Sequence, residues 1–349
     1  MKAAVYHGKE DIRISDVDTP TIGDGEILIK VHACAVCGTD MRTYNHGHKS
    51  IEPGRVLGHE FCGEIVENAS NNPLAIGERV VMYIVMPCGE CRYCQKGIDN
   101  MCMNRTTLSY HHDGAFAEYV AIPEKAVANN HLYKVPDAIH SDAAALCEPL
   151  GCVLNAHGRL QVTSDDQVVV LGSGPIGVMH ALVAKVHGAK NVMLLDPSKE
   201  RLDIAERFGF DHYIQVSSDK AHHDAVMKAT DGFGADVVIV ACSVAAAQSD
   251  ALELAGKQGR VEFFGGLPKD KPMTTLDGNL IHYKELMITG SFSEKRIDFE
   301  RAQDLIMTEK IPALDIITHS LDIDNLTDAF GMMTSGESLK VCIHPNGVI

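Results

Sequence analysis

The chain has 349 residues, of which 45% are hydrophobic, and it carries a formal net charge of −16. At about 150 residues per domain this length predicts two domains, and the hydrophobic fraction is enough for two buried cores. The acidic balance, without any dense run of Lys or Arg, argues against nucleic acid or an anionic membrane as a partner.

The sequence shows no signal for secretion or for a membrane. No stretch reaches the roughly 18 apolar residues that a membrane-spanning helix needs, and residues 1–7 lack the apolar core of a signal peptide. Eleven cysteines in this setting are typical of reduced thiols and metal ligands, not of a disulfide framework. We therefore expect a cytoplasmic protein.

The part of the chain before about residue 145 is rich in short β-branched runs broken by Gly, Asp and Pro. Residues 26–31, 63–66 and 79–85 are examples. Apolar residues at every second position, with turn residues at the breaks, predict an antiparallel, barrel-like β domain.

Four cysteines lie within fifteen residues of this part: Cys88, Cys91, Cys94 and Cys102. Four thiolates at this spacing can close a tetrahedron around one zinc ion, which then has no open position and is structural. A ferredoxin-type iron–sulfur cluster is the alternative, but its last gap has three residues and is followed by Pro. The last gap here is longer and Met103 follows, so we expect structural zinc holding residues 87–105 as a loop.

Three shorter motifs supply further metal-ligand residue types: Cys37-Gly38-Thr39-Asp40, Gly58-His59-Glu60 and Glu148-Pro149-Leu150. One thiolate, one imidazole and one or two carboxylates can hold a zinc ion that keeps a position open for substrate. Taken singly, Cys37 is equally well explained as a core thiol and Glu148 as a surface carboxylate.

From residue 167 onward the pattern changes. Continuous apolar runs at 167–171, 191–196, 236–241 and 260–265 alternate with helical patterns at 175–187 and 198–208. Buried strands that alternate with helices predict a doubly wound parallel sheet and an α/β fold. Beyond about residue 293 we expect one helix, 299–310, and a last strand, 339–343.

A G-x-G-x-x-G motif, residues 172–177, follows the first of these strands and opens the helix after it. In this context it predicts a dinucleotide site whose pyrophosphate lies at the helix N-terminus. Asp196 ends the next strand, where a carboxylate binds the adenosine ribose and repels a 2′-phosphate, so NAD is favoured over NADP. Lys199 and Arg201 weaken that preference, and Asp196 can also cap the following helix through Ser198.

Together and in this order, these motifs resemble the zinc-containing medium-chain dehydrogenases/reductases of the polyol dehydrogenase branch, the sorbitol and iditol type, with threonine dehydrogenases nearby. The resemblance covers the full length. It implies a GroES-like β-barrel catalytic zinc domain formed by residues 1–150 and 291–349, with an NAD-binding Rossmann domain, residues 151–290, inserted between these segments.

The resemblance also implies roles for individual residues and two zinc ions per chain. Cys37, His59 and Glu148 would bind the catalytic zinc, Glu60 would enter or leave its shell, and Thr39 would begin a proton relay. Cys147, beside Glu148, offers a thiolate if the motif shifts by one residue, but Pro149 and Leu150 support Glu148. Cofactor contacts would come from Gly172, Gly174, Pro175, Ile176, Gly177, Asp196, Arg201 and Ser291.

The activity implied is oxidation of a secondary hydroxyl of a sugar alcohol to a ketose, with hydride transfer to NAD, by a homodimer or homotetramer. Tyr44 and Phe116 match substrate-pocket positions, whereas residues 290–293 lack the Arg common in sorbitol dehydrogenases. Lys49 lies in a basic loop that either is simply solvated or binds the phosphate of a sugar-alcohol phosphate, such as arabitol or galactitol phosphate. A threonine-type dehydrogenase and a non-catalytic NAD- and zinc-binding module remain alternatives, while a zinc-free quinone reductase would lack both metal signatures.

Overall fold

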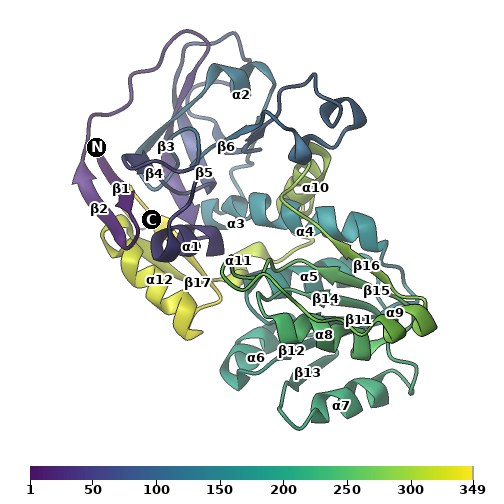
Figure 1. Ribbon diagram of the computed structural model, residues 1–349. Coiled ribbons are helices and arrows are strands. Elements are labelled where there is room, and N and C mark those ends of the chain that lie inside the picture. The colour runs from purple at the N-terminus through teal and green to yellow at the C-terminus, as the bar shows by residue number, and fades with distance from the viewer. Residues whose placement is uncertain (348–349) are drawn as a thin grey trace. The chain divides into compact units, whose positions relative to one another are not determined.

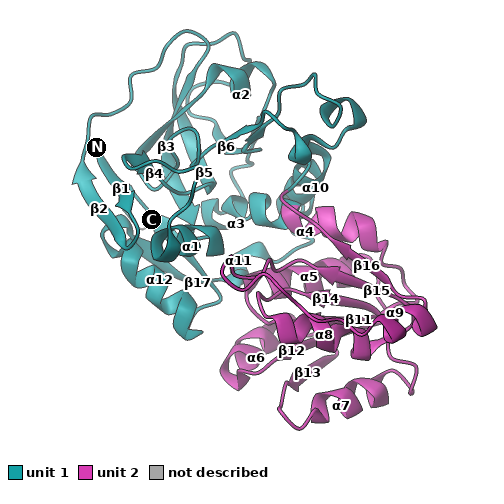
Figure 2. Ribbon diagram, viewed as in Figure 1, with its two compact units in different colours: residues 1–151, 294–349 teal, residues 152–293 magenta. Residues whose placement is uncertain are grey.

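The computed structural model describes residues 1–347; the last two residues of the expected segment 291–349 lie outside the described part. The chain forms two compact units, residues 1–151 with 294–349 (unit 1) and residues 152–293 (unit 2), coloured separately in Figure 2. These limits differ from the expected domain limits by one to three residues. The order of helices and strands can be followed in Figure 1.

Unit 1 is built on a mostly antiparallel sheet of seven strands. Its main path runs β10-β6-β5-β3-β18-β17, with β9 paired to β3, and a smaller sheet has the order β2-β1-β4. The strands are β1 (Lys2–Gly8), β2 (Asp11–Asp16), β3 (Ile27–Ala35), β4 (Arg55–Val56), β5 (Glu60–Asn68), β6 (Arg79–Met82), β7 (Val85–Met86), β8 (Thr106–Thr107), β9 (Tyr119–Ile122), β10 (Leu132–Lys134), β17 (Ile317–Asp322) and β18 (Lys340–His344).

Among the described residues, six helices belong to unit 1, and a seventh, α4 (Cys147–Leu160), begins there and continues into unit 2. The six are α1 (Gly38–His46), α2 (Glu124–Ala128), α3 (Ser141–Ala145), α10 (Arg296–Met307), α11 (Ala313–Ile316) and α12 (Leu326–Ser335). The helix expected at 299–310 thus begins and ends three residues earlier. Residues 87–105 are mainly loop, as expected, with two short 3-10 turns, η1 (Cys94–Lys96) and η2 (Asp99–Met101).

Unit 2 is a six-stranded parallel sheet in the order β13-β12-β11-β14-β15-β16, which confirms the predicted doubly wound fold. The strands are β11 (Gln167–Leu171), β12 (Asn191–Asp196), β13 (His212–Gln215), β14 (Ala235–Val240), β15 (Ala255–Phe263) and β16 (Met287–Gly290). The helices are α5 (Pro175–Val186), α6 (Lys199–Ala205), α7 (Ala221–Ala229), α8 (Ala245–Leu254) and α9 (Gly278–Lys284).

The central strands of unit 2 are apolar because both of their faces are covered. The side chains Val168, Val169 and Val170 of β11 are fully buried, as are Val237 to Val240 of β14. β13 and β16 were not predicted, because these short outer strands carry little apolar patterning. None of the helices within residues 1–347 combines the length and the apolar character needed to cross a bilayer.

Two expected elements are each divided into two shorter ones. The predicted strand 79–85 is divided into β6 and β7, because β6 pairs with β5 and β10 whereas β7 pairs with β8. The predicted helix 198–208 is α6 followed by a 3-10 turn, η3 (Glu206–Phe208). The final strand, β18, pairs in parallel with β17, so the unit 1 sheet is not entirely antiparallel.

Candidate functional site

The four clustered cysteines converge in unit 1, with Sγ atoms within 4.8 Å of one another. Three Sγ–Sγ distances are 3.9 Å (Cys88–Cys94), 3.5 Å (Cys91–Cys94) and 3.5 Å (Cys88–Cys102). Sulfurs bound to zinc at about 2.3 Å in a tetrahedron lie about 3.8 Å apart. The thiols therefore have the spacing that one zinc ion requires. Four thiolates would fill all four positions of a tetrahedral ion and leave none open for substrate.

Main-chain N–H groups favour thiolates in this cluster. The N–H of Cys91 donates to Sγ of Cys88, and that of Cys88 donates to Sγ of Cys102. N–H groups of Cys94 and Met103 lower the pKa of Cys91 to about 6. Burial and the neighbouring thiols raise the pKa of Cys94 to about 12. Thiolates this close together repel one another, so some of the thiols keep their protons. A bound divalent cation stabilises all four in the deprotonated form.

A second ligand group in unit 1 consists of Cys37, His59 and Glu60, whose ligand atoms also lie within 4.8 Å of one another. Cys37 is the N-cap of α1, where its Sγ accepts the N–H of Thr39. Glu60 is the first residue of β5, and His59 directly precedes it. A helix start and a strand start thus bring together the thiolate, imidazole and carboxylate that suit zinc.

Asp40, for which the sequence suggested no role, orients two of these ligands. Its carboxylate accepts the N–H of Cys37 at 2.9 Å and lies 3.6 Å from Nδ1 of His59. Although burial lowers the pKa of His59, the charges of Asp40 and Cys37 raise it well above its usual range. The imidazole is therefore protonated in the absence of metal, because its negative neighbours stabilise a positive charge at this position. A carboxylate behind a metal-binding His is a common orienting arrangement.

Lys340, at the start of β18, was also missed. Its Nζ lies 2.5 Å from Oε2 of Glu60, and both residues are almost completely buried. Burial lowers the pKa of Lys340, but the charges of Glu60, Cys37 and Glu148 raise it above its ordinary value, so the side chain stays an ammonium. The local sequence around residue 340 carries no metal-ligand pattern that would have identified it.

Glu148 lies in the first turn of α4 and is buried. Burial raises its pKa to about 7, with His59 and Lys340 opposing this rise and Glu60 and Asp40 adding to it. The carboxylate is therefore in electrostatic reach of the ligand group. It does not belong to the set of ligand atoms within 4.8 Å of one another, which comprises Cys37, His59 and Glu60.

The other predicted catalytic and substrate residues are not part of this ligand group, and each has contacts of its own. The hydroxyl of Thr39 accepts a hydrogen bond from Arg42 at 2.9 Å. The ring of Tyr44 packs on Phe330 with centroids 5.3 Å apart. Phe116 is fully buried, and Lys49 is exposed on the loop after α1.

The glycine motif has the expected geometry in unit 2. Gly172 has φ +106°, a conformation that favours glycine, and a Cβ on Gly177 would lie 1.8 Å from the carbonyl oxygen of Gly172. Gly174 is the N-cap of α5 and Pro175 its first residue. No side chain caps the helix, so the main-chain N–H groups from Ile176 onward have no capping partner. This arrangement leaves main-chain N–H groups to bind phosphate.

Asp196 ends β12, where its carboxylate joins the glycine turn to the next helix. One oxygen accepts the N–H of Ser173 at 2.7 Å and the other accepts the N–H of Ser198 at 2.9 Å. Helix α6 is capped by the Ser198 hydroxyl, which accepts the N–H of Arg201. Asp196 thus supports the turn while keeping its negative charge beside it. Ser291, the remaining cofactor candidate, directly follows β16.

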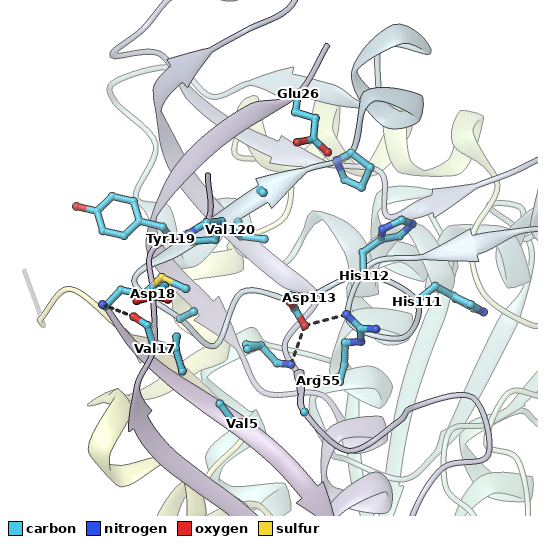
Figure 3. A pocket seen from close by; sticks show the side chains of 18 residues that line it. Val5, Val17, Asp18, Glu26, Arg55, His111, His112, Asp113, Tyr119 and Val120 are labelled. Carbon is cyan, nitrogen blue, oxygen red and sulfur yellow. Dashed lines mark hydrogen bonds and ion pairs between the residues drawn. The ribbon is translucent and has the colours of Figure 1, made fainter. Parts of the chain in front are cut away.

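A separate cavity of about 490 Å³ in unit 1 is not built from any of these residues (Figure 3). Its lining includes Asp18, His112, Tyr119 and an ion pair, 2.9 Å long, between Arg55 and Asp113. Because no candidate ligand lines it, its shape gives no information about the substrate of the metal site.

Comparison with known proteins agrees with this geometry. Residues 23–137 match the family model described as Alcohol dehydrogenase GroES-like domain, and residues 175–308 match that described as Zinc-binding dehydrogenase. The chain belongs to the zinc-containing medium-chain dehydrogenase/reductase family, and the family and fold expected from its motifs are confirmed.

Within that family the chain is similar to a sorbitol dehydrogenase of Halalkalibacterium halodurans, 34% identical over 99% of each chain. It is also 34% identical to an L-threonine 3-dehydrogenase of Rhizobium etli, over 98% of this chain and 97% of the relative. A protein of Sinorhizobium meliloti described as a zinc-binding dehydrogenase, solved with NADP bound, superimposes with a TM-score of 0.89 at 30% identity, covering 99% of each chain. The chain is therefore an oxidoreductase of the zinc alcohol dehydrogenase family.

Proposed function

We propose that the protein oxidises a secondary hydroxyl of a sugar alcohol to a ketose and transfers the hydride to NAD. The observation that carries this proposal is the group formed by Cys37, His59 and Glu60, of which His59 and Glu60 are buried, with the carboxylate of Glu148 in electrostatic reach. These residues fit a zinc ion with an open coordination position. The similarity to a sorbitol dehydrogenase supports the substrate class.

In this proposal unit 1 is the catalytic domain and unit 2 the cofactor domain. Zinc held by Cys37, His59 and Glu148 would act as a Lewis acid that lowers the pKa of a substrate hydroxyl, and NAD would accept the hydride. Asp40 keeps the imidazole of His59 oriented. Lys340 holds Glu60 by its ion pair, so that this carboxylate need not occupy the open position.

Thr39 would receive the substrate proton. Its hydroxyl oxygen already accepts from Arg42, so a second lone pair and its own proton remain for a relay. The nearby guanidinium also disfavours accumulation of positive charge on the hydroxyl, which favours onward transfer of the proton to water.

NAD is proposed over NADP because the carboxylate of Asp196 carries its charge at the end of β12, beside the glycine turn. A 2′-phosphate placed there would meet that charge. We also infer a cytoplasmic location and a closed homo-oligomer, a dimer or tetramer. The four zinc-binding thiols suit a reducing compartment, and symmetric assemblies are general among enzymes.

The test is a panel of C4–C6 polyols, their phosphates, L-threonine and simple alcohols, incubated with NAD⁺ at alkaline pH while NADH absorbance is followed. A chelator-sensitive signal with a polyol supports the proposal. Cys37→Ser should abolish the signal, whereas Cys152→Ser, a thiol outside both metal clusters, should retain it. No signal from protein that binds only one zinc ion would favour a non-catalytic binding module instead.

A threonine dehydrogenase is the second candidate, favoured by the similarity to L-threonine 3-dehydrogenases at 34% identity. L-threonine also carries a secondary hydroxyl, so the same zinc chemistry applies. The panel separates the two, because an amino-acid substrate needs groups that bind its ammonium and carboxylate. NADH formation from L-threonine with none from polyols would replace the first proposal by the second.

A further inference from the structure

Another group of metal-ligand side chains lies in unit 2, where α7 packs against α8. His222 and His223 belong to the first turn of α7, and Asp250 lies within α8. One ligand atom from each of the three lies within 4.8 Å of the others. Two adjacent histidines and an aspartate far along the chain form no recognisable motif, so only the fold brings this group together.

The carboxylate of Asp250 contacts both imidazoles. Its Oδ2 lies 2.8 Å from Nε2 of His222, and its Oδ1 lies 2.5 Å from Nε2 of His223. The side chains of His222, His223 and Asp250 are 3%, 17% and 16% exposed. The three polar ends are therefore turned toward one another and largely removed from water, while two of them remain within reach of a dissolved ion.

A second carboxylate lies behind His223. Oε2 of Glu253 is 3.6 Å from Nδ1 of His223, and Nζ of Lys220 holds both oxygens of Glu253, at 2.8 and 2.6 Å. Glu253 is three residues after Asp250, so the two carboxylates project from the same face of α8. An imidazole that binds a metal through Nε2 carries its proton on Nδ1 and donates it to an acceptor such as a carboxylate. Glu253 is placed to be that acceptor.

The Nδ1 atom of His222 has a different neighbour. It accepts the N–H of Ser217 at 3.4 Å, so without a metal Nε2 carries the proton that Asp250 accepts. Binding of a cation at Nε2 moves this proton to Nδ1 and ends the contact with Ser217. That contact is longer than an ordinary hydrogen bond of about 2.7–3.2 Å, and Ser217 lies in the loop between β13 and α7. The cation therefore displaces only a weak interaction.

Two imidazoles and one carboxylate are ligands that zinc and other divalent transition-metal ions favour, whereas Mg²⁺ and Ca²⁺ prefer oxygen ligands throughout. Ligand atoms bound to one tetrahedral zinc ion at about 2.0–2.2 Å lie about 3.3 Å apart. The contacts of Asp250 with the two imidazoles are shorter than this, at 2.8 and 2.5 Å. A bound ion thus requires the carboxylate to withdraw by less than about 1 Å, which a small side-chain rotation provides.

We propose that His222, His223 and Asp250 form a binding site for a divalent transition-metal ion that joins α7 to α8. Three protein ligands leave the remaining coordination positions to water. Because the unfolded chain does not hold these ligands together, a bound ion stabilises folded unit 2. The site is separate from both metal-ligand groups described in unit 1, and it does not rest on the proposed function.

The test is isothermal titration calorimetry with Zn²⁺ on untagged, zinc-loaded protein that has been freed of loosely bound metal. Wild-type protein should take up one further ion per chain, and its melting temperature should rise with zinc. Outer partners of metal ligands are worth about 10–100-fold in affinity. His223→Gln and Asp250→Asn each alter a ligand itself, so each should raise the Kd for Zn²⁺ at least about tenfold. Mg²⁺ and Ca²⁺ should not bind at this site.

His282→Gln is the matched control. His282 is an exposed histidine of α9 in the same unit, and it belongs to none of the metal-ligand groups found within residues 1–347. Its replacement removes an imidazole from the surface of unit 2 without touching α7 or α8. We expect the uptake of zinc and its Kd to equal those of the wild-type protein.

Equal zinc binding by the wild-type protein and by the His223 and Asp250 variants would overturn the inference. So would a wild-type protein that takes up no further zinc, since the three side chains would then form only a hydrogen-bonded contact between two helices. The wild-type titration gives this answer even if the variants do not fold. Equal binding of Mg²⁺ would overturn the class of ion. None of these measurements involves turnover or a cofactor, so they are independent of the polyol assay.

Discussion

Replacing Lys340 by Met should destabilise the metal-free protein strongly, because it leaves the carboxylate of Glu60 buried without its cation. Glu60 and Lys340 are 1% and 2% exposed, and their charged atoms lie 2.5 Å apart. Removing one partner of a buried ion pair costs about 3–5 kcal/mol, since the remaining charge keeps its desolvation penalty. Methionine fills much of the space of the lysine stem, so the lost charge dominates the effect.

The expected change in melting temperature follows from the size of unit 1, about 200 residues. At about 2.1 cal/mol/K per residue, its unfolding entropy is about 0.4 kcal/mol/K, so the loss corresponds to about 7–12 °C. In the zinc-loaded protein the cation compensates part of the charge of Glu60, and we expect less than half of that shift. Calorimetry of metal-free and zinc-loaded samples measures both values.

Lys2→Met is the control for this experiment. Lys2 forms an ion pair with Asp324 at 2.7 Å in the same unit, but the side chains are 46% and 54% exposed. An exposed pair contributes little to stability because water and salt screen it, so the control should melt within about 2 °C of wild type. Lys340→Arg, which keeps the charge, should recover most of the loss. Equal melting of Lys340→Met and Lys2→Met, or a larger loss with zinc than without it, would refute the reasoning.

Four further outcomes are expected. Cys91→Ser should reduce bound zinc from two ions to one and lower the melting temperature, yet folded protein with its remaining zinc should stay active; inactive protein of that kind would contradict a purely structural role. Asp196→Ala should narrow the preference for NAD over NADP in kcat/KM, and an unchanged ratio would mean that another residue reads the ribose. Metal-free protein should lose stability as pH rises from about 4.5 to about 7, because burial raises the pKa of Glu148 on folding; pH-dependent melting of Glu148→Gln should lack this loss. Lys49→Ala should raise the KM for a polyol phosphate more than for the free polyol, and equal effects would remove the phosphate hypothesis.

Local patterns were sufficient to predict much of unit 2. The strand at 167–171 and the helix after it are specified by a continuous apolar run, a glycine N-cap and a proline at the first helical position. These signals act within a few residues of one another, so the sequence displays them directly. The short outer strand β16 lacks such a signal, because only its pairing with β15 makes it a strand.

Long-range pairing decided the features that were not predicted in unit 1. Nothing in residues 79–85 indicates that the strand is interrupted, since the interruption reflects a change of partner: β6 pairs with β5 and β10, whereas β7 pairs with β8. The parallel pairing of β17 with β18 likewise reflects where the C-terminal segment returns to the sheet, which composition and periodicity do not reveal.

In the candidate metal site too, some contacts follow from local sequence spacing and others arise only from the fold. Cys37 and Asp40 are three residues apart, and the capping of α1 that joins them could have been inferred from that spacing. Lys340 has no such signal, because only the fold brings the start of β18 within reach of the start of β5, on the other side of β3. An ammonium buried among metal-ligand residues is visible only when segments from both ends of the chain are seen together.

The buried charges show why these two residues matter to the site. Asp40 and Glu60 bring negative charge to one small buried region, and Lys340 compensates only Glu60 directly. The remaining demand for positive charge falls on His59, whose pKa is raised by Asp40 and Cys37. A proton therefore holds the position that a divalent cation would take, and the two compete for it. Because Lys340 pairs with Glu60, the carboxylate of Asp40 is the negative charge that a proton on His59, or a metal ion bound there, balances.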